Sequence, residues 1–420
     1  MPKADARLDR LETFGELMAE SLGHADRRGP CIDYLNGLLL PGDRKSMEPM
    51  AARLDARRTG AKHQSLQHFV SESPWDEQRL LDAMRSYALP AMMACGGVTA
   101  WVVDDTGIPK KGRHSVGVGR QYCGVLGKQD NCQVAVSVSL ANERMGLPVS
   151  WRLYLPEAWA EDAQRRAKAK VPAEVSFRRK WEIAHDEIDR LMAAGIPPGI
   201  VLADAGYGMI TEFRRGLTQR GLTYAVGVLP EQGVALAREE SPRRRVKPKE
   251  ENARTVAMAL PASAWRTVTW REGTHGDQSS RFAAVRVRHT HRVKVKEPVR
   301  PVEWLVIEWP TGESEPRKYA LSTLPQDIEL SEMVRLLKMR WRIERDYEDL
   351  KGELGLDHFE GRSWTGFHHH GALCLAAFAF IAAERVRGFS PSRAAFLPPR
   401  QTPEDFRPRG SPPRTHHPRP

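Results

Sequence analysis

The hydrophobic positions of the chain change their period near residue 96, and this change divides the sequence into two kinds of region. Over residues 1–95 apolar residues recur every three or four positions, and turn signals stand at Pro41-Gly42 and Ser73-Pro74. No alternating strand pattern interrupts this region. We therefore expect residues 1–95 to form a separate helical domain.

Short apolar runs and alternating runs begin at Thr99 and predict a β-sheet. In NCQVAVSVSL, for example, Val134, Val136 and Val138 share one face, as in a half-buried strand. The predicted elements are, in chain order, strands at 99–104, 131–140 and 147–155, a charged helix at 157–194, a strand at 199–204, a helix at 211–220 and a strand at 223–229. Residues 96–229 therefore have the predicted order β-β-β-α-β-α-β, which makes them the first part of an α/β core.

The pattern after residue 229 predicts a β-rich insertion and then two helices. Four alternating runs joined by basic loops mark residues 230–322; three lie at 265–270, 281–289 and 302–309, and the fourth starts at 318. Residues 323–387 form the second part of the core, with helices at 331–354 and 371–387. Residues 388–420 are rich in Pro and Arg and lack apolar periodicity, so we expect a disordered tail.

The predicted helix 331–354 carries charged residues among its apolar positions. With about 100° per residue counted from Arg340, the side chains of Arg340, Lys351 and Glu344 lie at about 0°, 20° and 40°, within the apolar half. An unpaired carboxylate buried there would cost several kcal/mol, so Glu344 requires an ion pair, a proton or a metal. A structural Arg340–Glu344 pair is one reading, and it is the favoured one for an isolated helix.

Composition favours a polyanionic partner and a reducing compartment. The formal net charge is +11, and each phosphate that a basic residue neutralises releases counterions. The five cysteines are scattered and form no C-x-x-C pair, which argues against zinc and redox sites. No signal peptide pattern stands at the N-terminus, and the apolar run 371–383 is shorter than the roughly 20 residues that span a bilayer. We expect a cytoplasmic protein that binds nucleic acid.

Two aspartates at strand ends complete a set of acids with Glu344. Asp104 ends the strand TAWVVD and Asp204 ends the strand GIVLAD, where side chains project toward loops that serve a site. Taken singly, each would more often be a turn or capping aspartate. Taken together, the three carboxylates offer the oxygen ligands that Mg²⁺ prefers. Two Mg²⁺ ions bound side by side can catalyse an in-line phosphoryl displacement. The order of the acids is the one that a ribonuclease-H-like nuclease requires.

These acids and their neighbours resemble the DDE transposases of bacterial insertion sequences, especially the insertion sequence 701 group. In the wider superfamily the last acid lies in the pattern Tyr-x2-Arg-x3-Glu-x6-Lys, and this chain has Leu337-x2-Arg340-x3-Glu344-x6-Lys351. Leu337 replaces the Tyr, which puts any role of that hydroxyl in doubt. The resemblance covers about residues 65–385 and includes GIPKKGRHSVGVGRQYCGVLGKQDNCQ and WTGFHHHGALCLAAFAF.

The choice of the first acid lies between two adjacent residues. In DDTG the family's Thr or Ser at the second position after the acid is Thr106, which selects Asp104, and Asp105 is the competing choice. The resemblance implies a ribonuclease-H-like mixed sheet with flanking helices, in which Asp104, Asp204 and Glu344 are catalytic. It also implies that they hold two Mg²⁺ ions, with Mn²⁺ as a possible substitute.

The resemblance further implies a transposase that cleaves the ends of an insertion sequence and joins their 3′-hydroxyls to target DNA. The N-terminal helices would bind the element's double-stranded ends, and a homodimer would pair them in the nucleoid. Arg340 and Lys351 would contact DNA phosphates or position Glu344, and Lys110 and Lys111 could line the DNA. The alternatives are a structure-specific nuclease without strand transfer and a non-catalytic DNA-binding descendant of a transposase.

Other motifs have simpler interpretations. The segment 122–129 fails the phosphate-loop spacing, so we predict a glycine-rich turn and no ATP site. Consecutive helical residues point about 100° apart, so His368, His369 and His370 are not expected to bind one metal ion. Tryptophans of the insertion are expected to form its core, although one could stack on an unpaired base; they are Trp265, Trp270, Trp304 and Trp309.

Overall fold

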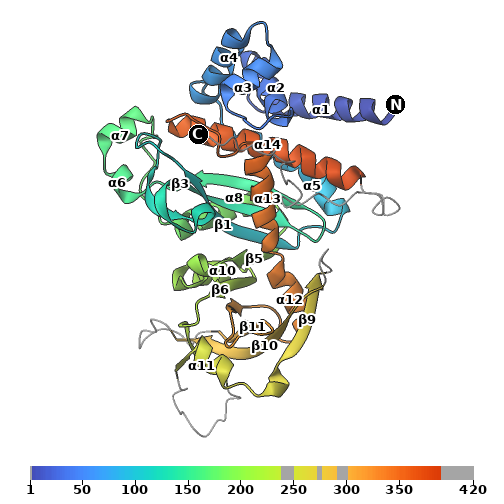
Figure 1. Cartoon of the computed structure of the whole chain (residues 1–420), viewed down its shortest axis with the longest axis vertical. Helices are drawn as coiled ribbons and strands as arrows, with labels where there is room; N and C mark the ends of the chain where they lie inside the picture. Colours follow the sequence, from blue (N-terminus) through green and yellow to red (C-terminus); the bar gives the residue numbers. More distant parts are fainter. Residues whose placement is uncertain (1, 238–249, 272–276, 291–300, 389–420) are drawn as a thin grey trace, which may run out of the picture.

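A mixed β-sheet runs through the whole computed structural model, with helices packed on both faces (Figure 1). The structure describes residues 2–237, 250–271, 277–290 and 301–388. In this part of the chain the sheet has 12 strands in the order β2-β3-β1-β5-β6-β12-β11-β10-β7-β8, with β4 paired to β3 and β9 paired to β10. The predicted mixed sheet with flanking helices is therefore confirmed.

The strands and helices have the following bounds. The strands are β1 (Ala100–Pro109), β2 (Gly119–Cys123), β3 (Lys128–Ala141), β4 (Gly146–Leu153), β5 (Ile200–Ala203), β6 (Tyr224–Val228), β7 (Gly233–Leu236), β8 (Glu251–Asn252), β9 (Arg266–Arg271), β10 (Gln278–His289), β11 (Glu303–Trp309) and β12 (Lys318–Ser322). The helices are α1 (Pro2–Glu20), α2 (Ala25–Leu39), α3 (Met47–Leu54), α4 (Thr59–Ser71), α5 (Glu77–Ala94), α6 (Glu157–Ala160), α7 (Ala163–Lys168), α8 (Lys180–Ala193), α9 (Ala205–Gly208), α10 (Thr211–Gln219), α11 (Ala253–Met258), α12 (Leu330–Lys338), α13 (Trp341–Gly352) and α14 (Trp364–Gly388).

The core of the sheet follows the predicted β-β-β-α-β-α-β order with two differences. A short strand, β2, pairs antiparallel to the start of β3. The predicted helix 157–194 is wrong as one element, because the structure divides it into α6, α7 and α8. Lys170 adopts a φ of 52°, and Val171 precedes Pro172, whose ring disfavours a helical conformation at the preceding residue. The chain therefore leaves the helix there and starts a new one at Lys180.

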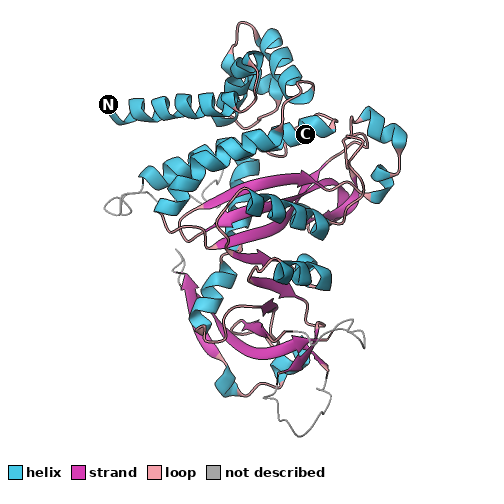
Figure 2. Ribbon diagram, turned by 180° about the vertical axis from the view of Figure 1, so that it is seen from behind, coloured by secondary structure: helices cyan, strands magenta, loops and turns pink. Residues whose placement is uncertain are grey.

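The β-rich insertion continues the same sheet. β12 pairs antiparallel to β6, and β11 and β10 follow it outward, so the insertion occupies the lower half of Figures 1 and 2. Trp265 packs edge-on against Trp309 with ring centroids 5.1 Å apart. Trp270 packs against Phe282 and lies under the ammonium of Lys338 at 3.9 Å. All four tryptophans are only partly buried, so they pack at the edge of the insertion's core and not within it, which corrects the expectation of core residues.

The predicted helix 331–354 is broken in two, and this corrects the position of Glu344. α12 ends at Lys338 and α13 begins at Trp341. Ile343, Tyr347 and Leu350 are buried on α13. They lie at about 300°, 340° and 280° on the wheel counted from Arg340, so the buried arc stops short of Glu344. The Glu344 side chain is 61 % exposed, and the expected buried face for Glu344 is wrong.

Asp346 is the acid that α13 does bury, although at about 240° from Arg340 it lies outside the half of the helix that the sequence indicates as apolar. Its side chain is only 7 % exposed, and burial raises its pKa to about 7. The sequence analysis took the direction of Arg340 as the middle of the apolar half of the helix. In the structure, the middle of the buried face of α13 lies between Ile343 and Leu350. Arg340, Glu344 and Lys351 still share one stripe, but that stripe lies at the edge of the buried face.

Helix α14 is the central helix of the upper half, between the sheet and the N-terminal helices (Figure 1). It contacts α2, α4, α5 and β4. By length and composition α14 is the one described helix that could cross a membrane, but 94 % of its apolar window is buried in the protein. It is therefore explained as a core helix. The tail from residue 389 onward, predicted to be disordered, lies outside the described residues.

The consecutive histidines of α14 do not converge on a common point. His368 Nε2 accepts a hydrogen bond from the backbone N–H of Leu153, whereas His370 Nδ1 lies 2.8 Å from the Tyr34 hydroxyl. His369 stacks on Trp75 with ring centroids 3.5 Å apart. Burial lowers the pKa of His370 to about 4. These buried histidines are engaged in packing and hydrogen bonds with three different parts of the chain.

A buried acid in the insertion gives a prediction about acid stability. Glu303 is fully buried; its carboxylate accepts a hydrogen bond from the Tyr224 hydroxyl at 2.6 Å and lies 2.5 Å from His289 Nδ1. Burial raises the pKa of Glu303, but the hydrogen bond and charge of His289 more than offset it, so the pKa is below the ordinary value of 4.5. The ionised carboxylate therefore contributes stability that is complete above that value and is lost as the pH falls through the folded-state pKa.

We expect the Glu303→Gln variant to lose part of this acid dependence. The free energy of unfolding, measured by urea titration from about pH 6 down to about pH 3, should fall less steeply in Glu303→Gln than in the wild type. The exposed Glu313→Gln variant serves as the control and should keep the wild-type slope. Equal slopes in wild type and Glu303→Gln would contradict the prediction.

Candidate active site

Two of the predicted acids lie on adjacent parallel strands. β1 pairs parallel to β5, and the last paired residues are Val102 and Leu202. Asp104 and Asp204 each follow two residues later, so their backbones stand at the same level of the sheet. Asp204 is the N-cap of α9, and its Oδ1 accepts a hydrogen bond from the Tyr207 N–H at 3.3 Å. The parallel pairing thus brings together two acids that are far apart in the sequence.

Burial dominates the electrostatic environment of Asp104, although one cation, Arg340, lies beside it. The Asp104 side chain is 21 % exposed. Burial raises its pKa to about 7; Arg340 opposes this shift and the neighbouring Asp204 adds to it. A carboxyl group in this environment is stabilised in its ionised form by any further cation that binds beside it.

Asp105 is held on the opposite face of β1. Successive side chains of a strand point to opposite sides of the sheet. Asp105 accepts hydrogen bonds from Lys180 Nζ at 2.6 Å and from the Tyr207 hydroxyl at 2.5 Å. Burial, followed by the charge of Asp105, raises the pKa of Tyr207 well above 10, so this hydroxyl keeps its proton and donates it. Asp105 is therefore held by a lysine and a tyrosine hydroxyl. Asp104 contacts Arg340 and lies near a second carboxylate, Asp204.

Arg340 connects the first acid to the last. Its guanidinium donates to Asp104 Oδ2 at 3.3 Å and to Glu344 Oε1 at 2.8 Å. The structural Arg340–Glu344 pair of the sequence analysis is therefore present, and it extends to Asp104. Among the described residues no group of at least three His, Cys, Asp or Glu side chains is arranged to hold a metal ion. In this structure a guanidinium is the cation that Asp104 and Glu344 share.

The donor set nevertheless suits a hard divalent cation. Asp104, Asp204 and Glu344 offer oxygen ligands only, as Mg²⁺ and Mn²⁺ prefer. Burial raises the pKa of Asp104 even with Arg340 beside it, and the contacts of Arg340 show that a cation is accepted between Asp104 and Glu344. We conclude that the ligand chemistry of these side chains suits a divalent metal ion, and that Arg340 neutralises Asp104 and Glu344 in this structure.

The four basic residues predicted to contact DNA differ in their surroundings. Lys351 Nζ donates to the carbonyl of Gly107 at 3.1 Å, and Lys110 Nζ donates to the carbonyl of Phe359 at 2.7 Å. Burial lowers the pKa of both lysines. Arg340 is paired with acids, and Lys111 is exposed. Their contacts with DNA remain a prediction, and of the four only Lys111 extends freely from the surface.

A cavity of about 400 Å³ lies beside the acids, and the insertion forms one of its walls. Asp204, Arg340 and Glu344 line it on the core side. Val306 of β11 and Tyr319 of β12 line the other side. The sequence did not predict this role of the insertion, because it arises from the pairing of β12 with β6, more than 90 residues earlier in the chain. The insertion therefore shapes the access to the site.

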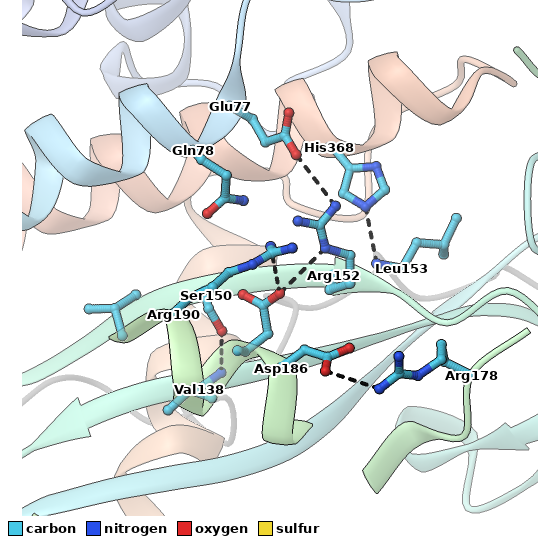
Figure 3. A network of polar contacts seen from close by, with 12 residues as sticks. Glu77, Gln78, Val138, Ser150, Arg152, Leu153, Arg178, Asp186, Arg190 and His368 are labelled. Carbon is cyan, nitrogen blue, oxygen red and sulfur yellow. Dashed lines mark hydrogen bonds and ion pairs between the residues drawn. The ribbon is translucent and has the colours of Figure 1, made fainter. Parts of the chain in front are cut away.

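A second polar network, away from the predicted acids, holds several elements together (Figure 3). Arg152 of β4 lies 3.5 Å from Glu77 of α5 and 3.4 Å from Glu187 of α8. Arg190 pairs with the same Glu187 at 3.1 Å, and His368 accepts from the backbone of Leu153. Since these charges neutralise one another, we assign the network to the packing of α5, α8 and α14 on β4.

Comparisons with known proteins agree with this arrangement. The family model described as DDE superfamily endonuclease matches residues 17–277, which include Asp104 and Asp204 but end before Glu344. A probable transposase for insertion sequence element IS701 from Microchaete diplosiphon is 33 % identical over 166 residues, which are 39 % of this chain. The match spans 40 % of that relative's length. Since the family model covers more than half of the sequence, the chain belongs to the DDE superfamily endonucleases.

Proposed function

We propose that this protein is a transposase that cleaves the ends of an insertion sequence and joins their 3′-hydroxyls to target DNA. The observation that carries the proposal is the parallel pairing of β1 and β5, which places Asp104 beside Asp204. Arg340 links Asp104 to Glu344 from α13. Membership of the family supports an endonuclease, and the similarity to an insertion-sequence transposase supports the joining step.

In this proposal Asp104, Asp204 and Glu344 hold two Mg²⁺ ions, for which Mn²⁺ can substitute. Bound divalent ions acidify the attacking water and stabilise the leaving oxygen of a phosphoryl displacement. The three carboxylates would hold the ions, and the buried setting of Asp104 would strengthen its interaction with a bound cation. With the two carboxylates held by metal, the guanidinium of Arg340 would be free to contact a DNA phosphate.

The remaining parts of the chain have roles that follow from the same proposal. The N-terminal helices, residues 1–95, bind the double-stranded ends of the element, and two copies of the chain pair those ends. Lys110, Lys111 and Lys351 add positive charge near β1, which favours phosphate contacts. The protein works in the bacterial cytoplasm on the nucleoid, where its DNA substrate lies.

Replacing Asp204 tests the proposal. Labelled duplexes that carry the DNA flanking the gene, mixed with a target plasmid and Mg²⁺, should yield cleaved ends and joined products with the wild-type protein. Asp204→Asn should bind the labelled ends within about twofold of wild type, because phosphate contacts dominate affinity, but should give neither product. Cleavage without joined products from the wild type would favour a structure-specific nuclease. Full cleavage by Asp204→Asn would overturn the assignment of this acid.

A further inference from the structure

The hairpin between β2 and β3 exposes an apolar tip. Tyr122 and Val125 are each 61 % exposed and Leu126 is 41 % exposed. In the part of the chain that the structure describes, no other stretch of five residues contains three exposed large hydrophobic side chains. Single exposed hydrophobics are ordinary, but a group on one projecting element marks an interaction surface. We call residues 122–128 the hairpin tip.

The base of the hairpin is fixed, so the exposure of the tip is a stable feature of the fold. β2 pairs with β3 from Gly119 opposite Cys132 to Cys123 opposite Lys128. Cys123 is fully buried against Gly107 of β1, where an added Cβ would lie 2.9 Å from its Sγ. Gly127 takes the left-handed φ of 63° that the turn requires. The sequence thus presents the apolar side chains on a rigid support.

The surroundings of the tip are strongly basic. Residues 110–130 contain five basic residues (Lys110, Lys111, Arg113, Arg120 and Lys128) against one acid, Asp130. Asp130 lies 3.3 Å from Lys128, and Lys111, Arg113 and Arg120 are exposed. Apolar side chains surrounded by basic ones suit a partner such as DNA. The basic side chains can contact its phosphates, and the apolar ones can contact its stacked bases.

The hairpin also lies near the candidate acids. Gly107, on which Cys123 packs, is three residues after Asp104, a separation of about 10 Å along a strand. The carbonyl of Gly107 accepts the hydrogen bond of Lys351, which is seven residues after Glu344 on α13. Each strand of DNA advances about 3.4 Å per nucleotide. A duplex cleaved at the acids would therefore meet the hairpin a few base pairs away.

We propose that the hairpin tip is a wedge that enters the base stack of the bound DNA near the cleaved bond. Val125 and Leu126 separate neighbouring bases, Tyr122 stacks on a base that is exposed, and Arg120 and Lys128 hold the flanking phosphates. Inserted apolar side chains unstack base steps in this way, and stacking on aromatic rings tolerates any base. The assignment rests on the proposed action on DNA, and it names an element that acts on the bases.

The wedge is tested by binding alone. The probes are a fluorescein-labelled duplex of about 30 base pairs and the same duplex with about three central mismatches, both measured in EDTA so that no cleavage takes place. We expect the wild type to bind the mismatched probe about tenfold more tightly, since mismatched bases are already unstacked. Val125→Ser/Leu126→Ser and, separately, Tyr122→Ala should reduce this preference at least about threefold and change the affinity for the paired probe less than about twofold.

Matched variants separate the wedge from other causes. Met93→Ser/Met192→Ser removes two exposed apolar side chains on α5 and α8 and should keep the preference. Arg120→Ala/Lys128→Ala should weaken binding to both probes equally and reduce its salt dependence. An unchanged preference in both tip variants, or an equal loss in the Met93/Met192 control, would overturn the proposal. So would a tip variant that changes only self-association, because the surface would then serve a second copy of the chain.

The outcome is independent of catalysis. A wild-type protein that prefers the mismatched probe through the tip but never cleaves DNA would keep the wedge and reject the transposase proposal. One that cleaves DNA but binds both probes equally would reject the wedge alone.

Discussion

Asp104→Asn is expected to lose more than about 100-fold in the rate of DNA cleavage, whereas Asp105→Asn is expected to stay within about fivefold of wild type. Loss of residues that merely support a metal ligand costs 10–100-fold, so loss of a ligand itself should cost more. Asp104 points toward Arg340 and Asp204, while Asp105 is occupied by Lys180 and Tyr207. The measurement is the rate of end cleavage in Mg²⁺ for both variants.

Stability provides the complementary readout for this pair. Asn at position 105 can still accept from the Tyr207 hydroxyl but loses the charge that faces Lys180, so we expect a lower free energy of unfolding, by about 1–3 kcal/mol. Asp104→Asn removes a carboxyl group whose pKa burial raises to about 7. Because the ionised carboxylate is unfavourable in that buried position, the free energy of unfolding above pH 7 should be unchanged or higher in the variant. If Asp105→Asn abolished cleavage in a folded protein and Asp104→Asn did not, the first acid would be Asp105.

The choice between these aspartates shows what the sequence could and could not determine. Alternation along a strand already implies that Asp104 and Asp105 point to opposite faces. Which face contains the site depends on the pairing of β1 with β5 and on the position of α13, and both are long-range contacts. The Thr106 spacing selected Asp104 by resemblance, and the structure adds the contact with Arg340.

Periodicity predicted the positions of the central strands, although β3 is buried on both faces from Cys132 onward and is not the half-buried strand that its alternation indicated. The strands β3, β5 and β6 lie where their apolar runs placed them, and the N-terminal helices follow their three-and-four spacing. It failed at the end of helix α12, where neither Gly nor Pro marks the break before Trp341. An unbroken wheel consequently placed Glu344 within the buried face and Asp346 outside it.

Local sequence patterns predicted neither the β2–β3 hairpin nor the continuation of the sheet into the insertion. The sequence predicts a glycine-rich turn at GVLGK, but it does not predict β2 before it, because β2 is only five residues long and mixes exposed, partly buried and buried residues. β12 pairs with β6 across about 90 intervening residues. The local sequence of neither strand indicates which distant strand it will pair with. The wall that the insertion contributes to the site is a consequence of this pairing.

Glu344→Gln should reduce cleavage by more than about 100-fold without destabilising the protein. The Glu344 side chain is 61 % exposed, and substitutions at exposed positions usually change stability by no more than about 0.5 kcal/mol. A large loss of activity would therefore report the loss of a ligand. Glu348→Gln, one turn later on α13 and also exposed, is the matched control and should cleave DNA at the wild-type rate.

Metal binding measured by thermal unfolding distinguishes a ligand from a residue that only pairs with Arg340. Ligands that bind the folded state raise the midpoint of unfolding, so Mn²⁺ should raise it for wild type and Glu348→Gln and raise it much less for Glu344→Gln. A residue that served only as the partner of Arg340 would leave the Mn²⁺ effect unchanged. Wild-type cleavage by Glu344→Gln, together with a wild-type response to Mn²⁺, would remove Glu344 from the site and return it to the structural ion pair with Arg340.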